Sequence, residues 1–400
     1  MKKKLAMLLT AAMLVGSLAA CGSSDNGSSA TGSAASNTEA GSSDAAVTEV
    51  STEGKQLTVQ IGPDPETIDP ALNSAVDGGN MLLHSFECLL TIDQDGKIAP
   101  GQAETWEVSE DGLTWTFHLR DGLKWSDGSD WKRVCDPVVA APYAETVLGM
   151  VKGFDEAQAG DVDALAVSAP DAKTFVVELS NPCPYFESLA AFATLSPVQQ
   201  ATVEANGDAW ATAAETYISN GPFNITEWVP GSHIIMSKNP YYWNADAIKL
   251  GSIKFVLMED SNAAYTAFQS GDVLFIKNVP TQEIPSLQGN PEFHVEPILG
   301  TYYLSLNLED PAFENVNVRK ALSLAIDRDY VANTLMQGTY SPAYNLVGEG
   351  WVDTDGSSFN ANANGGQSYI SDDFDANLEE AKKLLADAGY PNGEGLPTIT

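Results

Sequence analysis

The clearest pattern of apolar and polar positions lies between residues 219 and 243, and it predicts a β-hairpin. Phe223–Val229 is rich in β-branched and aromatic residues, which favour strands. Pro230-Gly231 fits the central positions of a type II turn, whose second central residue needs a positive φ. Ser232–Ser237 returns as a second apolar strand, and Asn239-Pro240 ends it. Taken alone, the pattern is that of an antiparallel hairpin in any globular domain.

Closely spaced Asp-Gly pairs predict a second β-rich region over Thr91–Arg120. Asp-Gly is a strong hairpin signal, because glycine accepts the positive φ of a tight turn. The pairs are Asp95-Gly96, Asp111-Gly112, Asp121-Gly122 and Asp127-Gly128. The first pair, in the sequence DQDG, could suggest a calcium loop, but the later ligands of an EF-hand are missing and we interpret it as a turn.

Elsewhere the chain alternates between patterns typical of strands and of helices. The predicted strands are Thr174–Leu179, Ile253–Leu257, Val273–Ile276 and Phe293–Leu308, the last interrupted at Gly300. The predicted helices are Met81–Leu90, Tyr185–Leu195, Asn262–Phe268, Val318–Leu335 and Asn377–Ala388. This alternation over more than three hundred residues predicts an α/β protein of more than one domain.

The first residues have the pattern of a secretion signal. Lys2–Lys4 precede an apolar run that is short for a transmembrane helix, and Leu18-Ala19-Ala20-Cys21 resembles a lipobox. We therefore expect residues 1–20 to be a signal peptide and Cys21 to be lipidated, the alternative being an ordinary cleavage site followed by a free thiol. Residues 21–55 are rich in Gly, Ser and Ala without apolar periodicity, and they predict a flexible linker.

Charge and cysteine content narrow the function classes. The net charge is −34, which argues against nucleic acid and against anionic lipid head groups as partners. A solvated acidic surface is the simplest interpretation. Cys88, Cys135 and Cys183 remain after Cys21, without metal-binding spacing, so at most one disulfide can form. Cys135–Cys183 is the favoured pair, because both cysteines lie beside prolines in loop-like sequence.

No catalytic motif is present. The histidines are dispersed, and the sequence contains no HExxH, GxSxG, P-loop or GxGxxG pattern. We therefore expect no enzymatic activity and no cofactor.

Four motifs in order resemble family 5 of the extracytoplasmic solute-binding proteins, the oligopeptide- and dipeptide-binding receptors of ABC importers. They are Leu57–Val59 followed by Thr67–Pro70, Trp115–Arg120 followed by Lys124–Gly128, Asn220–Trp243, and Val318–Arg328. The resemblance extends from about Leu57 to Tyr390. Two features depart from the family: Asp130 runs directly into Trp131-Lys132-Arg133, where the family has a longer helix, and the chain stops at Thr400 where the family continues.

The resemblance implies a two-lobed, type II periplasmic-binding-protein-like fold with an extra inserted domain. The first lobe would be discontinuous, formed by residues 57–91 and 208–299. The inserted domain would occupy residues 92–207. Residues 300–400 would form the first part of the second lobe, which on this expectation is truncated.

The resemblance also implies a function and a site. An oligopeptide would bind between the lobes and be delivered to membrane permease subunits, with the protein tethered to the outer face of the membrane through Cys21. Ligand contacts would come from the loop Val76-Asp77-Gly78-Gly79 and, where the lobes cross, from Tyr302, Tyr303 and Asn307. The carboxylate that holds the ligand's amino terminus is expected beyond residue 400.

Alternatives remain open at the level of the sequence. The candidate site residues could instead be packing or turn residues. The same scaffold could bind a nickel chelate, a sugar or an opine. A secreted hydrolase or adhesin that shares only the α/β pattern is a further possibility.

Overall fold

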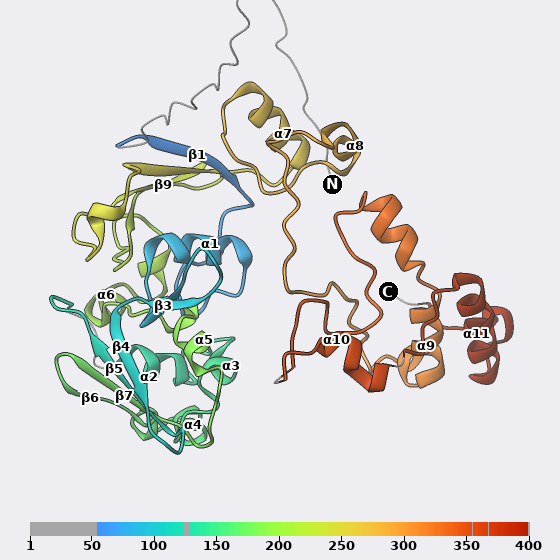
Figure 1. Ribbon diagram of the computed structural model, residues 1–400, viewed down its shortest axis with the longest axis horizontal. Coiled ribbons are helices and arrows are strands. Elements are labelled where there is room, and N and C mark those ends of the chain that lie inside the picture. Colours follow the sequence, from blue (N-terminus) through green and yellow to red (C-terminus); the bar gives the residue numbers. More distant parts are fainter. Residues whose placement is uncertain (1–53, 124–128, 354, 367, 399–400) are drawn as a thin grey trace, which may run out of the picture. The chain divides into compact units, whose positions relative to one another are not determined.

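The structure is a computed structural model that describes residues 54–123, 129–353, 355–366 and 368–398 (Figure 1). The predicted signal peptide, Cys21 and most of the predicted linker lie outside these residues, as does the turn at Asp127-Gly128. The strands are β1 (Gln56–Ile61), β2 (Leu90–Ile92), β3 (Ile98–Pro100), β4 (Ala103–Val108), β5 (Thr114–Leu119), β6 (Val167–Asp171), β7 (Thr174–Glu178), β8 (Phe223–Val229), β9 (His233–Lys238) and β10 (Ser252–Leu257). The helices are α1 (Val76–Ser85), α2 (Ser129–Cys135), α3 (Ala144–Leu148), α4 (Phe154–Gln158), α5 (Phe186–Ala190), α6 (Gln200–Asn206), α7 (Ser261–Ser270), α8 (Ile284–Leu287), α9 (Val316–Leu324), α10 (Phe359–Asn362) and α11 (Phe374–Asp387).

The predicted hairpin is confirmed as β8 and β9, which form one side of a sheet in the order β1-β10-β9-β8. Gly231 has a φ of +68°, which the predicted type II turn requires. Ile234 and Met236 on β9 are completely buried, whereas Ile235 between them is only partly buried. This alternation follows from the period of two along a strand and sets one face of the sheet against the core. β1 joins the sheet by pairing in parallel with β10.

The Asp-Gly meander is also confirmed. β2 pairs with β3, and a second sheet has the order β4-β5-β7-β6, whose strands are all antiparallel to their neighbours. Gly96 and Gly112 adopt φ values of +76° and +73° in the turns. At the DQDG turn the side chain of Asp93 accepts hydrogen bonds from the backbone N–H groups of Asp95 and Lys97, both at 2.9 Å. The carboxylate therefore stabilises the turn itself.

Each sheet has its own apolar cluster. The cluster of the second sheet includes the buried Trp115, Phe117 and Val177, and it extends to Trp131 on α2 and Phe186 on α5. The ring of Trp131 lies edge-on to that of Phe175 at 5.1 Å between centroids. The cluster of the first sheet draws on α1 and β1 together with later residues from Val198 to Phe255. Both sheets therefore bury one face, and the predicted domain boundaries at residues 91/92, 207/208 and 299/300 stay a prediction.

Several predicted helices differ in their boundaries. The helix predicted over Met81–Leu90 begins earlier, at Val76, and ends at Ser85, because Leu90 starts strand β2. The helix predicted over Tyr185–Leu195 is split into α5 and a 3-10 turn at Ala193–Leu195. The helix predicted over Val318–Leu335 ends at Leu324, and a π-helical turn covers Tyr330–Leu335. Helices α7 and α11 lie within three residues of their predicted boundaries.

Arg328 explains the break in the long predicted helix. Its guanidinium donates hydrogen bonds to the carbonyl oxygens of Ser323 at 2.8 Å and Ile326 at 3.2 Å, and to that of Ala343 at 2.8 Å. The carbonyls of Ser323 and Ile326 lie at the end of α9, where helical hydrogen-bond donors run out. The cationic side chain of Arg328, which follows the helix in the sequence, thus caps the C-terminal end of α9.

Two predicted strands are wrong. Val273–Ile276 forms no strand, although Leu274 donates a backbone hydrogen bond to Thr58 of β1 at 2.8 Å. Phe293–Leu308 is irregular throughout. For Phe293–Leu308, the alternating pattern specifies which face of a strand would be apolar, but a strand forms only where a neighbouring strand accepts its hydrogen bonds.

The predicted Cys135–Cys183 disulfide is also wrong. Cys88, Cys135 and Cys183 are all free thiols and all buried. Cys135 is the last residue of helix α2 rather than part of a loop. Burial raises the pKa of both Cys88 and Cys135 to about 12, so these thiols stay protonated and pack as small apolar side chains.

Candidate functional site

The residues Val76-Asp77-Gly78-Gly79 form the first turn of α1 rather than the predicted loop. The helix begins after Ala75, whose backbone is extended, and Asp77 places a negative charge in the first turn. Val76 is exposed, Asp77 and Gly79 are partly buried, and Gly78 is buried. Gly-Gly breaks isolated helices, so the sequence alone pointed to a loop.

Gly78 allows other atoms to come close to the helix backbone, but these atoms belong to the protein itself. A Cβ atom at this position would collide with the Oδ1 atom of Asn73 and would lie 2.9 Å from the carbonyl oxygen of Thr67. The side-chain amide of Asn73 in turn donates a hydrogen bond to the carbonyl of Ala75 at 3.1 Å. The glycine therefore packs α1 against the turn that precedes it.

Asp69 fixes that turn to helix α2. Its side chain is almost completely buried, and its two oxygens accept a bidentate pair of hydrogen bonds from the guanidinium of Arg133. The same carboxylate accepts hydrogen bonds from the indole N–H of Trp210 and the backbone N–H of Ala71, both at 2.9 Å. A buried carboxylate is tolerated only when it is paired and hydrogen-bonded, and Asp69 meets both conditions. The sequence singled out Asp69 and Arg133 separately, without a signal that they meet.

Glu87 gathers the aromatic residues that follow the hairpin. Its carboxylate accepts hydrogen bonds from the hydroxyl of Tyr242, the indole N–H of Trp243 at 2.7 Å and the side-chain amide of Gln102 at 2.7 Å. Burial, with a contribution from Glu87, raises the pKa of the Tyr242 hydroxyl above its ordinary value. The guanidinium of Arg120 lies 3.7 Å above the centre of the Trp243 ring, a cation–π contact. These contacts join the first sheet to the residues around the second.

Tyr302, Tyr303 and Asn307 lie in the irregular segment that follows Gly300. Both tyrosine side chains are largely exposed, at 86% and 64%. Asn307 has a local role, because its side-chain oxygen accepts a hydrogen bond from the backbone of Glu309 at 3.1 Å. For the described residues, no hydrogen bond, ion pair or ring contact joins these side chains to the first turn of α1. The structure therefore describes both predicted sets of ligand-binding residues, and none of these interactions connects the two sets.

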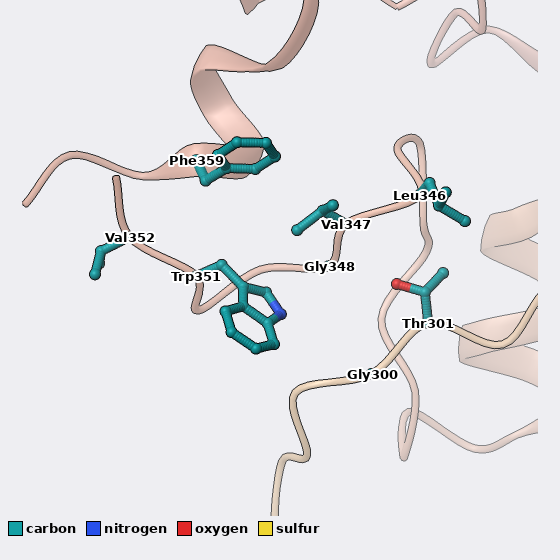
Figure 2. A pocket seen from close by; sticks show the side chains of 8 residues that line it. All are labelled: Gly300, Thr301, Leu346, Val347, Gly348, Trp351, Val352 and Phe359. Atoms are coloured by element: carbon teal, nitrogen blue, oxygen red, sulfur yellow. The ribbon is translucent and has the colours of Figure 1, made fainter. Parts of the chain in front are cut away.

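A pocket of about 410 Å³ adjoins this segment and was not foreseen from the sequence. Figure 2 shows its lining on separate stretches of chain, with Phe359 at the start of α10. The lining residues are Gly300, Thr301, Leu346, Val347, Gly348, Trp351, Val352 and Phe359. The sequence feature that could have predicted this pocket is the cluster of apolar residues around Trp351 in an otherwise polar, glycine-rich stretch. The same combination also occurs in ordinary surface loops.

Two further kinds of site are absent from the described residues. No group of three or more histidine, cysteine, aspartate or glutamate side chains there could hold a metal ion. Of the helices in the same part of the chain, none reaches the length and apolar character that a bilayer span requires.

Comparison with solved structures defines the class of protein. A periplasmic oligopeptide-binding protein from Borrelia burgdorferi superposes with a TM-score of 0.77 and 30% identity, covering 86% of this chain and 69% of that one. The Haemophilus influenzae OppA complex with the peptide RPPGFSPFR superposes with a TM-score of 0.75 and 31% identity, covering 85% and 68%. The fold is therefore the α/β, two-lobed, type II periplasmic-binding-protein-like fold.

The sequence comparison gives the family. Residues 97–400 match bacterial extracellular solute-binding proteins, family 5 Middle, and the chain belongs to this family. The oligopeptide-binding protein OppA of Bacillus subtilis is 37% identical over 307 residues, which cover 73% of this chain and 56% of that protein. The Escherichia coli periplasmic oligopeptide-binding protein OppA is 33% identical over 353 residues, covering 84% and 63%. The chain thus spans less than two thirds of the length of these curated relatives.

Proposed function

We propose that this protein is the substrate-capturing component of an ABC importer and that it binds oligopeptides for delivery to membrane permease subunits. The main support is its likeness, at 31% identity, to a Haemophilus influenzae protein whose structure contains a bound peptide. Family membership points in the same direction. The ligand is bound and released without covalent change, so the proposed role requires no catalysis and no cofactor.

The exposed residues of the segment after Gly300 are the proposed ligand contacts. Tyr302 and Tyr303 offer aromatic faces and hydroxyl groups, and Asn307 has an amide N–H₂ group that can donate to a peptide carbonyl. At the first turn of α1, Val76 and Asp77 are the accessible candidates, while Gly78 and Gly79 shape the backbone beside them. Asp77 would suit a cationic group of the ligand, because a carboxylate and an ammonium form charge-assisted hydrogen bonds.

Native mass spectrometry of the full-length protein, released gently from its own cells, tests peptide binding. We expect a series of adducts that fragment into peptide ions, because an importer receptor is isolated with ligand from its surroundings. Unfolding and refolding in clean buffer should remove the adducts, and added peptides of graded length should restore them. A refolded protein that binds peptides of no length would overturn the proposal.

A second candidate ligand class is supported by one relative. The probable deoxycholate-binding periplasmic protein YgiS of Escherichia coli is 34% identical over 298 residues, which cover 71% of this chain and 55% of that protein. A single adduct with the mass of a steroid acid or another non-peptide solute, in place of peptide adducts, would favour this class.

We further propose that the protein is held at the outer face of the membrane through a lipid on Cys21. Three lysines, an apolar run and the lipobox-like Leu18-Ala19-Ala20-Cys21 support the proposal. One acyl chain binds a membrane only weakly and two or more bind stably, so the anchor would carry at least two. The Gly- and Ser-rich residues after Cys21 would then separate the folded part from the bilayer.

Lipidation predicts a defined chemical mass and a change of cell fraction. The N-terminal proteolytic peptide should begin at Cys21 and carry the mass of a diacylglyceryl group. The variant Cys21→Ala should leave the membrane fraction, and Cys88→Ala, which alters a buried thiol, should remain there. An N-terminal peptide that begins at Met1, or one with an unmodified Cys21, would contradict the proposal.

A further inference from the structure

The first turn of helix α1, which carries proposed ligand contacts, is positioned by the turn that precedes it. The side-chain amide of Asn73 donates a hydrogen bond to the carbonyl of Ala75 at 3.1 Å, and its Oδ1 atom occupies the place that a Cβ atom of Gly78 would need. The backbone N–H of Asn73 donates to the carbonyl of Asp69 at 2.9 Å. The turn that begins at Asp69 therefore determines, through Asn73, where the first turn of α1 lies.

The other end of α1 is connected to the same aspartate. Ser85, the last residue of the helix, has its hydroxyl oxygen 2.9 Å from that of Tyr217, and both residues are buried. The ring of Tyr217 stacks on that of Trp210, at 5.6 Å between centroids and 5° between planes. The indole N–H of Trp210 donates to the carboxylate of Asp69 at 2.9 Å. Two series of contacts, one from each end of α1, therefore end at Asp69.

Arg133 connects this network to the second sheet. It lies on α2, whose Trp131 packs in the apolar cluster of that sheet, and its guanidinium donates to both carboxylate oxygens of Asp69. A bidentate pair fixes the orientation of a carboxylate as well as its distance. Since Asp69 is only 2% exposed, its position depends on these protein groups rather than on water.

We propose that Arg133 is a positioning residue for ligand binding, which acts through Asp69 to fix the place of the first turn of α1. This inference rests on the proposed peptide-binding function and adds to it a role for α2, on which no proposed ligand contact lies. Groups that bind a ligand must be held within about 0.5 Å of their productive geometry, so a residue behind them controls affinity without touching the ligand.

Contacts with the first sheet are the alternative means of positioning α1. The ring of His84 lies edge-on to that of Phe255 on β10, at 5.3 Å between centroids, so α1 also packs on that sheet. If these contacts suffice, the loss of Arg133 lowers the stability of the protein and leaves its affinity unchanged. The two explanations therefore differ in the affinity of a variant that is still folded.

Peptide affinity, measured at a temperature where each variant is folded, tests the proposal. The probe is the alanine peptide of two to six residues that full-length, ligand-free wild-type protein binds most tightly. Arg133→Met should raise its dissociation constant at least about tenfold, the lower end of the effect that supporting contacts have at metal sites. Arg133→Lys keeps the charge but not the planar fork, and its dissociation constant should lie between the two.

The outcomes separate this inference from the proposed function. If the dissociation constant of Arg133→Met equals that of the wild type, the first sheet suffices to position α1 and the inference is wrong, while the proposed function stands. If the wild-type protein binds none of the alanine peptides, the proposed function and the inference fail together.

Two further variants separate positioning from stability. Phe117→Ala removes a ring from the cluster of the second sheet and not from that of α1, so it should keep the dissociation constant within about twofold of the wild type. Where this variant does not fold, Phe117→Leu takes its place. Asp69→Asn/Arg133→Met removes both buried charges but leaves α2 without its bidentate contact, so the affinity should stay weak. An affinity that recovers with stability, or falls equally in the Phe117 variant, contradicts the inference.

Hydrogen exchange under native conditions gives a readout that needs no ligand. Arg133→Met should exchange faster than the wild type in residues 69–86, which include α1, and at the wild-type rate in the hairpin of β8 and β9. Phe117→Ala should instead exchange faster in β4 to β7. A uniform increase over the whole protein in Arg133→Met, or none in residues 69–86, would show that Arg133 does not position α1.

Discussion

Replacing Arg133 by methionine is expected to lower the free energy of unfolding by about 3 to 5 kcal/mol. Methionine keeps much of the length of the side chain but leaves the carboxylate of Asp69, which is 2% exposed, without its cationic partner. The N–H groups of Trp210 and Ala71 would still donate to it, but they carry no full charge. Urea unfolding followed by tryptophan fluorescence measures the change.

Two controls separate this pair from ordinary surface charges. The double variant Asp69→Asn/Arg133→Met removes both charges and should be more stable than Arg133→Met alone. Lys152→Met breaks the exposed ion pair with Glu178, where the N–O distance is 3.0 Å, and should cost less than about 1 kcal/mol. If Arg133→Met costs no more than Lys152→Met, the pairing described for Asp69 is not what stabilises the turn.

Replacing Phe117 by alanine should cost about 3 to 5 kcal/mol, because it leaves a cavity in the core of the second sheet. Phe117 lies on β5, one of the inner strands of this sheet, and is completely buried. Its ring centre is 6.4 Å from that of Trp115 and 6.5 Å from that of Phe186, so several aromatic neighbours lose contacts together. Thermal and urea unfolding of the same variant measure the loss.

A graded series checks the origin of that loss. Phe117→Leu should cost less than Phe117→Ala, since leucine fills part of the space. Phe275→Ala removes a ring that is 57% exposed and should change the stability by no more than about 0.5 kcal/mol. Equal losses at Phe117 and Phe275 would be inconsistent with a packed core around β5.

Elements whose pairing is local in the sequence were predictable. The hairpin of β8 and β9 closes through a short turn at Pro230-Gly231, and the meander closes through Asp-Gly turns. Helix α11 carries its own N-cap, since the side chain of Asp373 accepts from the backbone N–H of Ala376 at 3.1 Å. In each case the residues that decide the structure lie within a few positions of one another, where sequence patterns are informative.

Elements that depend on distant partners were not predictable. The alternation in Phe293–Leu308 indicates an apolar face but cannot supply a strand to pair with, and this segment is irregular. The Cys135–Cys183 disulfide was inferred from neighbouring prolines, whereas Cys135 ends a buried helix. Gly78-Gly79 suggested a loop because helix propensity describes an isolated segment. In the folded protein, Gly78 is required because the side chain of Asn73 packs against it.

The candidate site likewise depends on residues that lie far apart in the sequence. The resemblance to a family led to Tyr302, Tyr303 and Asn307, which are accessible in the structure. The pocket lined by Trp351 and Phe359 depends on a loop that returns to Gly300 from almost fifty residues later, and no motif announces it. The contacts of Glu87 with Gln102, Tyr242 and Trp243 likewise join residues that only the fold brings together.

The parallel pairing of β1 with β10 has a consequence for how the chain folds as it is made. Gln56 and Ser252 at the start of this pair are 196 residues apart, so β1 stays unpaired until the intervening chain has become available to fold, at the ribosome or after the proposed export. The sheet of β4 to β7 involves much shorter loops and can form during that interval. The polar residues Gln56, Thr58 and Gln60 alternate with apolar ones along β1 and keep half of the waiting strand compatible with water. Nascent β1 is therefore the segment on which we expect chaperones to act first.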